Sequence, residues 1–459
     1  MQSTQTTLKQ ELWSTLVLAA PLSAAFAGNH LMGLVDTAIM GRLGAVALAG
    51  TATGATLFFI VSVFGMGILF GLEPFIAQAI GAGEEDKAYR HYREGIVLSL
   101  LMCIPLILML VLSPFVLPVL KFDEATIKAV QYYVIARAPG LAFMYMYRTS
   151  KAYLQANHIT RPMVASTIIA NILNVFTTAF LAMGDQALQK VGLPAIGFAG
   201  WGVFGAGIST TFMSCLQWLI LRHYVAQQRQ THQIDDTQPI QRKALVHLLR
   251  LGWPLSIQYL AEGGLFALVT LLMGQFGPVI LSGHQIALQL ASFTFVICVG
   301  FGSATTVRVG HAAGKEDRAG AQVAGIAGLI WGVMFMSVSG MMFYTFPKQL
   351  AGWFAVNEQI IEAAVPFMLM AAIFQVVDGI QAVSSSALRG IGDIKIPALF
   401  YLASHWCIGL PLSWYLTFGG GEQDPVAMWW GLIAGLSFAS VSLCTRFFLL
   451  CRKPIKRML

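Results

Sequence analysis

Residues 16–40 read LVLAAPLSAAFAGNHLMGLVDTAIM, an apolar run in which Asp36 is the one acidic residue. The run is long enough to cross a bilayer as a helix, which takes about 20 residues. Its apolar character continues well past Gly28, so it is too long for the apolar region of a secretory signal peptide. A charged side chain inside such a helix is costly and usually marks a functional site, so Asp36 is a candidate for binding an ion or a proton.

The composition extends this interpretation to the whole chain. Of its 459 residues, 57% are hydrophobic and 11% are charged, and the mean hydropathy is +0.70. Soluble domains carry roughly 25% charged residues, so the composition predicts an all-α integral membrane protein. About twelve membrane-spanning helices are expected, near residues 12–40, 45–80, 95–116, 129–150, 162–184, 200–224, 248–273, 279–310, 320–346, 363–387, 396–418 and 427–451.

The net charge of +7 is better explained by membrane topology than by nucleic-acid binding. If both termini are cytoplasmic, most of the 28 Lys and Arg residues fall in the expected inner segments, as the positive-inside rule requires. The six cysteines are scattered without CxxC spacing, so neither a disulfide framework nor a zinc site is indicated.

The chain repeats itself at an offset of about 233 residues. The segment around Gly41 returns around Gly274, and the segment that begins at Gly83 returns at Gly314. An even number of spans in each half gives parallel repeats, an architecture that transporters use for alternating access. We therefore expect an N-terminal lobe, a cytoplasmic linker and a C-terminal lobe, at residues 1–225, 226–247 and 248–459 respectively.

Two further acids, Glu262 and Asp378, lie inside apolar runs of the second half. Helical spacing places Gln258 on the same face as Glu262, and Gln381 on the same face as Asp378. Carboxylate and amide oxygens suit Na⁺, so Glu262 and Asp378 are candidate ligands for a sodium ion. Two close carboxylates without a cation would instead share a proton, so both H⁺ and Na⁺ stay open as the coupling ion.

Polar stripes at helical spacing recur on other spans, at Asn171, Asn174 and Thr178 in the first half and at Gln285 and Gln289 in the second. Such stripes face the protein interior or a wet cavity. Simple hydrogen bonding between helices explains them equally well. Adaptable apolar side chains suit promiscuous ligands, and the candidates for lining a cavity are Met32, Phe266, Met370 and Phe374.

Several short motifs follow one another along nearly the whole chain: Val35-Asp36-Thr37, Glu73-Pro74, Gly283-His284-Gln285 and Leu388-Arg389-Gly390. In this order they resemble the MATE (multidrug and toxic compound extrusion) family, and most closely its NorM-like branch. The resemblance implies two six-helix lobes around a V-shaped cavity. It also implies export of cationic, amphipathic drugs and dyes in exchange for H⁺ or Na⁺, without another cofactor.

By the same resemblance, the proton-linked acid of the first lobe falls on Asp36, and the cation-site acids of the second lobe fall on Glu262 and Asp378. Asn174 and Asn171 match amides of the first lobe. The implied setting is the bacterial cytoplasmic (inner) membrane, with both termini in the cytoplasm and the monomer as the working unit. The partners are then drugs and membrane lipid, with no nucleic acid.

One segment departs from the family's pattern. Val296-Ile297-Cys298 stands where NorM-like chains usually carry Met-x-Pro, and the loss of the proline predicts a straighter eighth span. Arg137, on the fourth span, is expected to snorkel or to pair locally.

Three other functions fit the sequence less well than transport of drugs. The alternative is a flippase for lipid-linked saccharides of the same superfamily, which should hold pyrophosphate with basic residues, whereas the candidates here are acidic. A proton-conducting subunit needs a chain of intramembrane Lys or His, and an enzyme needs a nucleophile or metal constellation; the sequence offers neither. It also has no GxxxxGK[ST] segment for binding ATP.

Overall fold

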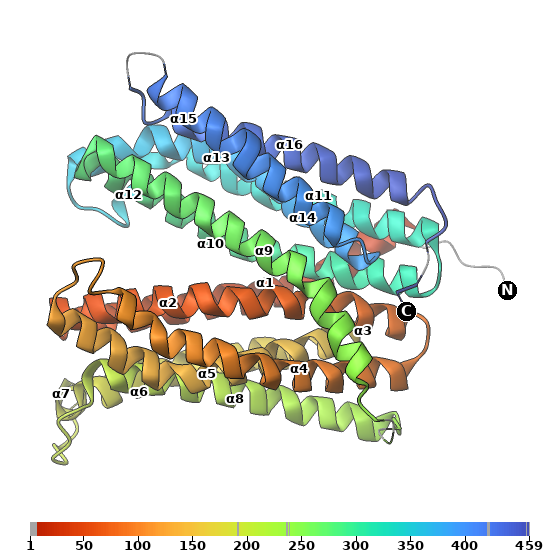
Figure 1. Ribbon diagram of the computed structural model, residues 1–459, viewed down its shortest axis with the longest axis horizontal. Helices are drawn as coiled ribbons and strands as arrows, with labels where there is room; N and C mark the ends of the chain where they lie inside the picture. Colours follow the sequence, from red (N-terminus) through yellow and green to blue (C-terminus); the bar gives the residue numbers. More distant parts are fainter. Residues whose placement is uncertain are drawn as a thin grey trace. The chain divides into compact units, whose positions relative to one another are not determined.

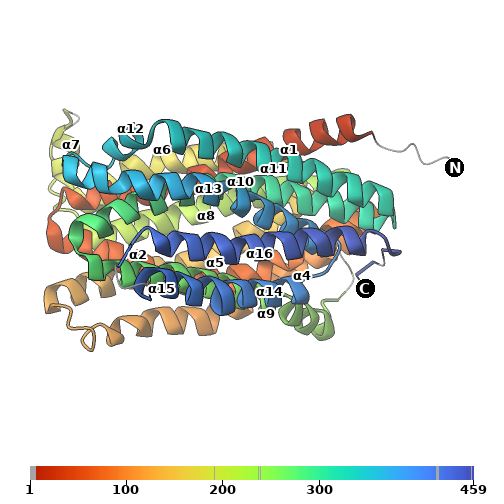
Figure 2. The same ribbon diagram turned by 90° about the horizontal axis from the view of Figure 1, so that it is seen from above.

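The computed structural model describes residues 7–190, 192–235, 237, 239–419, 423–455 and 457–458. Within these residues the regular secondary structure is helical, without a strand, which confirms the predicted all-α class. The chain divides into two compact units, and in each the long helices run side by side (Figures 1 and 2). Unit 1 holds the described residues up to Phe26, Glu73–Glu84 and Trp253–Leu459, and unit 2 holds Ala27–Leu72 and Glu85–Gly252.

Unit 2 contains the second part of the first helix and the other long helices of the first half. Their bounds are α1 Leu8–Gly41, α2 Ala45–Phe70, α4 Glu85–Leu112, α5 Glu124–Ala156, α6 Arg161–Met183 and α8 Gly202–Thr231, with the short η1 Ser113–Val116 and α7 Asp185–Lys190. Asp123 caps α5, because its carboxylate accepts a hydrogen bond from the backbone N–H of Thr126 at 2.8 Å.

Unit 1 contains the helices of the second half together with α3. Their bounds are α3 Leu72–Gly81, α9 Arg242–Met273, η2 Gly274–Phe276, α10 Pro278–Gly314, α11 Arg318–Thr345, α12 Pro347–Gly352, α13 Glu358–Gly390, α14 Lys395–Leu402, η3 Ala403–Gly409, α15 Leu410–Phe418 and α16 Ala427–Leu450. α9 passes from unit 2 to unit 1 after Gly252. η3 is a π-helical segment, a distortion that is frequent at functional sites.

Eleven helices of the described chain are long and apolar enough to cross a membrane. The fourth of the expected spans is not among them, although α5 has 33 residues. It carries Arg137, Arg148 and Lys151, which lower its hydropathy. α5 is therefore the least hydrophobic of the twelve expected spans, and it is the one best suited to an interior position.

The connection between the two halves is shorter than the expected linker, residues 226–247. α8 continues to Thr231 and α9 begins at Arg242. The end of α8 is rich in Gln, which has a good helix propensity, so the helix extends beyond its apolar part.

The two units also differ from the two halves of the sequence, since the first part of α1 packs with the second half. Arg308 donates two hydrogen bonds of 2.6 Å to the carboxylate of Glu11, an ion pair with the fixed geometry of a guanidinium and a carboxylate. Ser23 Oγ donates to the carbonyl of Ile297 at 2.8 Å, and Trp331 Nε1 donates to the carbonyl of Leu12 at 2.9 Å. α1 thus belongs to unit 1 until Phe26 and carries Asp36 in unit 2.

Residues 73–84 join unit 1 through contacts of α3 that sequence separation alone does not suggest. A Cβ on Gly310 would lie 2.7 Å from the Cβ of Ala77, so the two helices approach as closely as a glycine permits. Gln78 Nε2 donates to the carbonyl of Gly390 at 3.0 Å, and Gln78 Oε1 accepts from the backbone N–H of Met458 at 2.8 Å. Gln78 therefore ties α3 to α13 and to the C-terminal segment.

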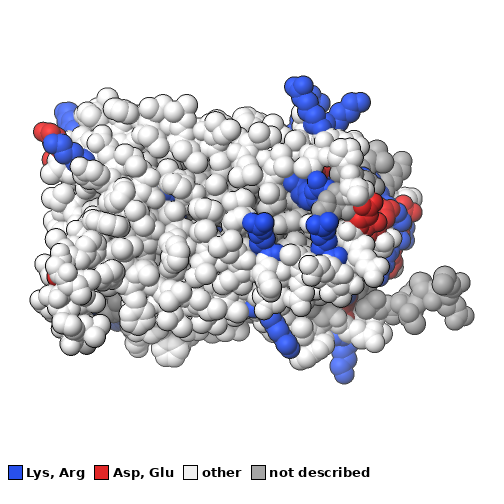
Figure 3. All heavy atoms as spheres, turned by 90° about the horizontal axis from the view of Figure 1, so that it is seen from below, with Lys and Arg blue, Asp and Glu red and all other residues white. Residues whose placement is uncertain are grey.

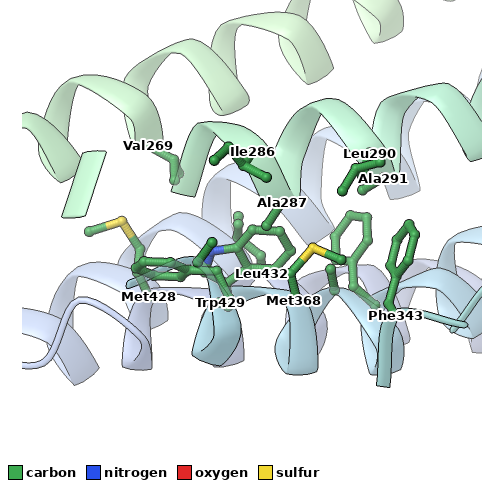
Figure 4. Close-up of a cluster of buried hydrophobic side chains, with 14 of the residues drawn as sticks. Val269, Ile286, Ala287, Leu290, Ala291, Phe343, Met368, Met428, Trp429 and Leu432 are labelled. Atoms are coloured by element: carbon green, nitrogen blue, oxygen red, sulfur yellow. The ribbon is translucent and has the colours of Figure 1, made fainter. Parts of the chain in front are cut away.

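The interior of unit 1 is a cluster of large apolar side chains (Figure 4). Trp429 and Met368 face Ile286 and Ala287 of α10, and Trp429 is 1% exposed. In a bilayer, packing of this kind stabilises helix association mainly through van der Waals contact. The cluster fixes the position of α13, the helix that carries Asp378.

Charged side chains are unevenly distributed over the surface. On the face drawn in Figure 3, Lys and Arg gather toward one end, and a broad band without charge occupies much of the rest. This is the pattern expected of a lipid-facing band bordered by a basic margin.

Candidate functional site

The first candidate site surrounds Asp36 on α1, a side chain that is 4% exposed. Thr210 Oγ1 of α8 donates a 2.7 Å hydrogen bond to Asp36 Oδ2, and Thr178 Oγ1 of α6 donates one of 3.0 Å to Oδ1. Both carboxylate oxygens are thus satisfied by neutral hydroxyl groups. Hydrogen bonding of this kind is what allows a charged carboxylate to remain buried.

The amide of Asn174 completes the surroundings of Asp36. Asn174 lies one helical turn before Thr178, and its Nδ2 donates to Thr178 Oγ1 at 3.1 Å. Its Oδ1 is buried and has no hydrogen-bond partner among the described residues. That oxygen is available to a donor or a cation that enters the site.

Asn171, the other predicted amide, makes different contacts. Its Nδ2 donates to the carbonyls of Gly28 at 3.0 Å and Thr167 at 2.9 Å. The side chain therefore joins α6 to α1 about two turns before Asp36 along α1. Asn171 is thus an example of simple hydrogen bonding between helices, the alternative explanation of the polar stripes.

Sequence reasoning missed the contribution of α8. Thr210 bonds Asp36 directly, and Ser209 Oγ lies 2.8 Å from Thr178 Oγ1. The available signal was the run of hydroxyl residues Ser209-Thr210-Thr211 inside an apolar helix.

A cation on α5 interacts with the same acid. The guanidinium of Arg137 lies 4.2 Å from the ring centroid of Phe58 and interacts electrostatically with Asp36. The expected local pairing of Arg137 is therefore present, with an aromatic ring and with Ser214, whose Oγ accepts from Nη1 at 3.4 Å.

The second candidate site lies in unit 1 and brings Glu262 of α9 together with Asp378 of α13. Asp378 is 5% exposed and Glu262 is half-buried, and the two acids interact electrostatically. Tyr401, just before the π-helical segment η3, interacts with both acids and with the amide of Gln258. Sequence reasoning missed Tyr401, since nothing separates it from other aromatic residues of an apolar helix.

Two amides of the second site have buried polar atoms without a hydrogen-bond partner among the described residues. Gln381 is fully buried, yet neither its Oε1 nor its Nε2 makes a hydrogen bond, and the buried Gln258 Oε1 has none either. An unsatisfied buried amide costs roughly 1–3 kcal/mol, so such groups call for an explanation. Carboxylate, amide and phenol oxygens are suitable ligands for Na⁺.

The other predicted residues of the second half divide into two groups. Gln285 and Gln289 of α10 are half-buried and exposed, respectively, and no hydrogen bond to either acid is found in the described part of the chain. Phe374 is 6% exposed and packs edge-on against Phe266 and Trp429, at centroid distances of 6.2 Å and 5.8 Å.

Met370 packs against the same apolar cluster as Phe374, while Met32 lies in a small cluster of unit 2 with Ala170 and Met213. These side chains are therefore at least partly core residues.

The segment that departs from the family's pattern lies beside Asp378. Cys298 is fully buried and interacts with Asp378, and α10 is an uninterrupted helix from Pro278 to Gly314. The straighter course expected of this span stays a prediction, because helices with an internal proline, such as α5 and α13, are also continuous.

A buried ion pair lies further along α13, between Arg389 and Glu73 of α3, with a nitrogen–oxygen distance of 3.6 Å. Arg389 also donates to Thr306 Oγ1 at 3.2 Å and to Ser386 Oγ at 3.3 Å. Removing one partner of such a pair leaves an uncompensated buried charge, so the pair is expected to hold α3 to α13.

Comparison with known proteins gives a consistent result. The family described as MatE matches residues 21–180 and 254–415. The chain is 33% identical to the multidrug resistance protein NorM of Burkholderia vietnamiensis, over 96% of this chain and 95% of the relative. It is 29% identical to the NorM of Aliivibrio fischeri, over 98% and 96%.

Solved structures share the fold. A eukaryotic MATE transporter has a TM-score of 0.83 at 20% identity, covering 96% of each chain. The Vibrio cholerae MATE transporter VcmN in the bent form has a TM-score of 0.83 at 17% identity, covering 98% of each chain.

Proposed function

Because the chain belongs to the MATE family, whose members are transporters and not enzymes, we propose that it is a secondary multidrug antiporter. In this proposal it exports cationic, amphipathic drugs and dyes in exchange for H⁺ or Na⁺. The curated relatives named above are multidrug resistance proteins, and they support the class of substrate.

The observation that carries the proposal is the burial of Asp36 among neutral hydroxyl groups. A carboxylate inside an apolar span is costly and is retained where it handles a charge. When ionised, Asp36 offers a cationic drug a counter-charge; when neutralised by a proton or a cation, it offers none. Competition between coupling ion and drug for one carboxylate is the simplest form of antiport.

Glu262 and Asp378 extend the proposal to a second ion. Two neighbouring acids with unpartnered amide oxygens could bind Na⁺ directly or share a proton. The energy comes from the ion gradient and the membrane potential, which supplies about 2.3 kcal/mol per elementary charge per 100 mV.

Several remaining features are part of the same proposal. In unit 2 the apolar candidate for drug contact is Met32, and in unit 1 the candidates are Phe266, Met370 and Phe374. Thioether and aromatic groups adapt to varied ligands and stabilise cations. The inner membrane, cytoplasmic termini and a monomeric working unit complete it.

The test is ethidium efflux from proteoliposomes under an imposed sodium or proton gradient. Asp36→Asn, Glu262→Gln and Asp378→Asn are compared with Asp185→Asn, a half-buried acid between two spans that accepts from the backbone N–H groups of Ile196 and Gly197. We expect gradient-driven efflux to fall at least about tenfold in one or more of the intramembrane variants and to persist in Asp185→Asn. Undiminished efflux by all three intramembrane variants would refute the proposal.

A further inference from the structure

The C-terminal segment, described at residues 451–455 and 457–458, lies against one end of unit 1 (Figure 1). Cys451 and Ile455 are buried in an apolar cluster that also contains Phe447 of α16. Burial of apolar side chains is the main force that holds such segments in place. The C-terminal segment is therefore firmly anchored to helices of the second half of the chain.

The same segment also contacts α3, which comes from the first half of the chain. Arg457 Nη1 lies 3.3 Å from Oε1 of Glu84, in the turn after α3. The backbone N–H of Met458 donates to Gln78 Oε1 of α3 at 2.8 Å. The side chains of Arg457 and Glu84 are 41% and 39% exposed. Exposed ion pairs and single hydrogen bonds contribute little net stability, so this attachment to α3 is readily reversed.

Arg457 joins two turns of unit 1. Its Nε also lies 3.5 Å from Oε1 of Glu316, in the turn between α10 and α11. The turn with Glu84 begins at Gly83 and the turn with Glu316 begins at Gly314, which are the corresponding positions of the internal repeat. One guanidinium therefore bridges two corresponding turns, one from each half of the chain.

α3 is the end of a membrane span whose larger part belongs to the other unit. Ala45–Gly81 is one span, yet α2 packs in unit 2 and α3 packs in unit 1 from Glu73 onward. α4, which follows α3, is again part of unit 2. Alternating access moves the two halves of a repeated transporter against one another. Such a movement pulls on Glu73–Glu84, because this short segment is held in unit 1 and is continuous with helices of unit 2.

We propose that the C-terminal segment is a latch that holds α3 in unit 1 in one state of the transport cycle and releases it in the other. The latch stays anchored at its apolar side and opens at Glu84 and Gln78. The inference rests on the proposed function, since a transporter that alternates between two states requires the release. It concerns the movement of the protein and not the identity of the drug or the coupling ion.

The test joins position 457 covalently to either of its two acidic partners. Arg457→Cys is combined with Glu84→Cys in one protein and with Glu316→Cys in another. Both proteins carry Cys407→Ser, which removes the exposed cysteine of the described chain. A bismaleimide with a reducible spacer joins each pair, and peptide mass spectrometry identifies the joined peptides. The pair with Glu316→Cys is the matched control, because it uses the same reagent and the same position of the latch.

The two joined pairs should behave differently. Joining Glu84→Cys to Arg457→Cys should lower the initial rate of ethidium efflux from proteoliposomes at least about tenfold relative to the same protein before joining, because a latch that cannot open stops the conformational step. Reduction of the spacer should restore efflux, which excludes misfolding as the cause. Joining Glu316→Cys to Arg457→Cys should leave the rate unchanged, because both positions lie in the second half of the chain and stay together.

Each outcome decides one question. Undiminished efflux after joining Glu84→Cys to Arg457→Cys, an equal loss in both pairs, or failure of that first pair to join would each overturn the latch. Gradient-driven efflux by the wild-type protein would in those cases still support the proposed function. Absence of gradient-driven ethidium efflux from the wild-type protein would instead count against the proposed function.

Discussion

The acid in unit 2 and the two acids in unit 1 are buried in opposite chemical surroundings. Asp36 receives hydrogen bonds on both oxygens and interacts with Arg137. Glu262 and Asp378 interact with one another beside amides that have unpartnered oxygens. The hydroxyl groups around Asp36 satisfy both oxygens of an ionised carboxylate. The second site instead holds two acids beside buried amide oxygens that have no partner among the described residues, and such oxygens suit a bound cation.

The largest expected effect is a difference between sodium-driven and proton-driven efflux when the two acids of unit 1 are replaced. We expect Glu262→Gln combined with Asp378→Asn to weaken sodium-driven efflux by about 100-fold, because neutral amides replace the anionic ligands of the site. Proton-driven efflux through Asp36 should fall less. Initial rates of ethidium efflux under separate sodium and proton gradients provide the measurement, and an equal loss under both gradients would remove the distinction between the two sites.

A smaller effect is expected from the hydroxyl that bonds Asp36. Thr210→Val keeps the shape and removes a hydrogen bond to a charged group, worth about 1.5–3 kcal/mol, so the ethidium concentration for half-maximal efflux should rise roughly tenfold or more. Thr211→Val is the matched control, since Thr211 Oγ1 donates to the carbonyl of Ala136 at 2.9 Å instead. Similar losses in the two variants would show that the bond to Asp36 has no special role.

Thermal unfolding should distinguish the unpartnered amide of unit 1 from a bonded one. Gln381→Leu removes two unsatisfied polar atoms, so without sodium the free energy of unfolding should stay equal or rise by about 1 kcal/mol. Gln375→Leu, on the same helix, loses a hydrogen bond to Thr294 and one of 3.2 Å to Ser339, and should be destabilised by about 1–3 kcal/mol. A marked loss of stability in Gln381→Leu would mean that its amide already has a partner.

The smallest effect concerns an acid outside the membrane spans. Backbone N–H groups of Ile196 and Gly197 hold the pKa of Asp185 below its ordinary value of 3.8. A depressed pKa adds stability above the ordinary value, and this is lost as the pH falls through the lower value. We therefore expect protease resistance of residues 184–201 to decrease below about pH 4 in the wild-type protein. The Asp185→Asn protein should lack that dependence, and an identical acid response in both would contradict the assignment.

The sequence was sufficient to predict the helical class, the approximate spans and the buried acids, because apolar length and lone charges are local signals. It could not place Arg137, Thr210 or Tyr401, because their roles depend on how neighbouring helices are rotated against one another. Asn171 and Asn174 show that a shared helical stripe does not determine what each side chain contacts. They lie three residues apart on one stripe, yet one bonds the carbonyl of Gly28 and the other lies beside Asp36.

The division into units escaped prediction for a related reason. The bonds that place the start of α1 in unit 1, such as Glu11 to Arg308, join residues about 300 positions apart. Hydrophobic periodicity does not predict such a contact. The internal repeat predicts two equal halves, and it does not predict that a segment of one half packs with the helices of the other.

The contact between Ala77 and Gly310 has a consequence for the ancestry of the fold. The two residues lie 233 positions apart, within two positions of the offset of 231 that relates Gly83 to Gly314 in the same segment. The duplicated segment therefore touches its own copy close to this point. In an ancestor with a single copy, such a contact is an isologous homodimer interface near a twofold axis. Bulk added to that segment is added on both sides of the axis, and small residues such as Ala77 and Gly310 avoid it.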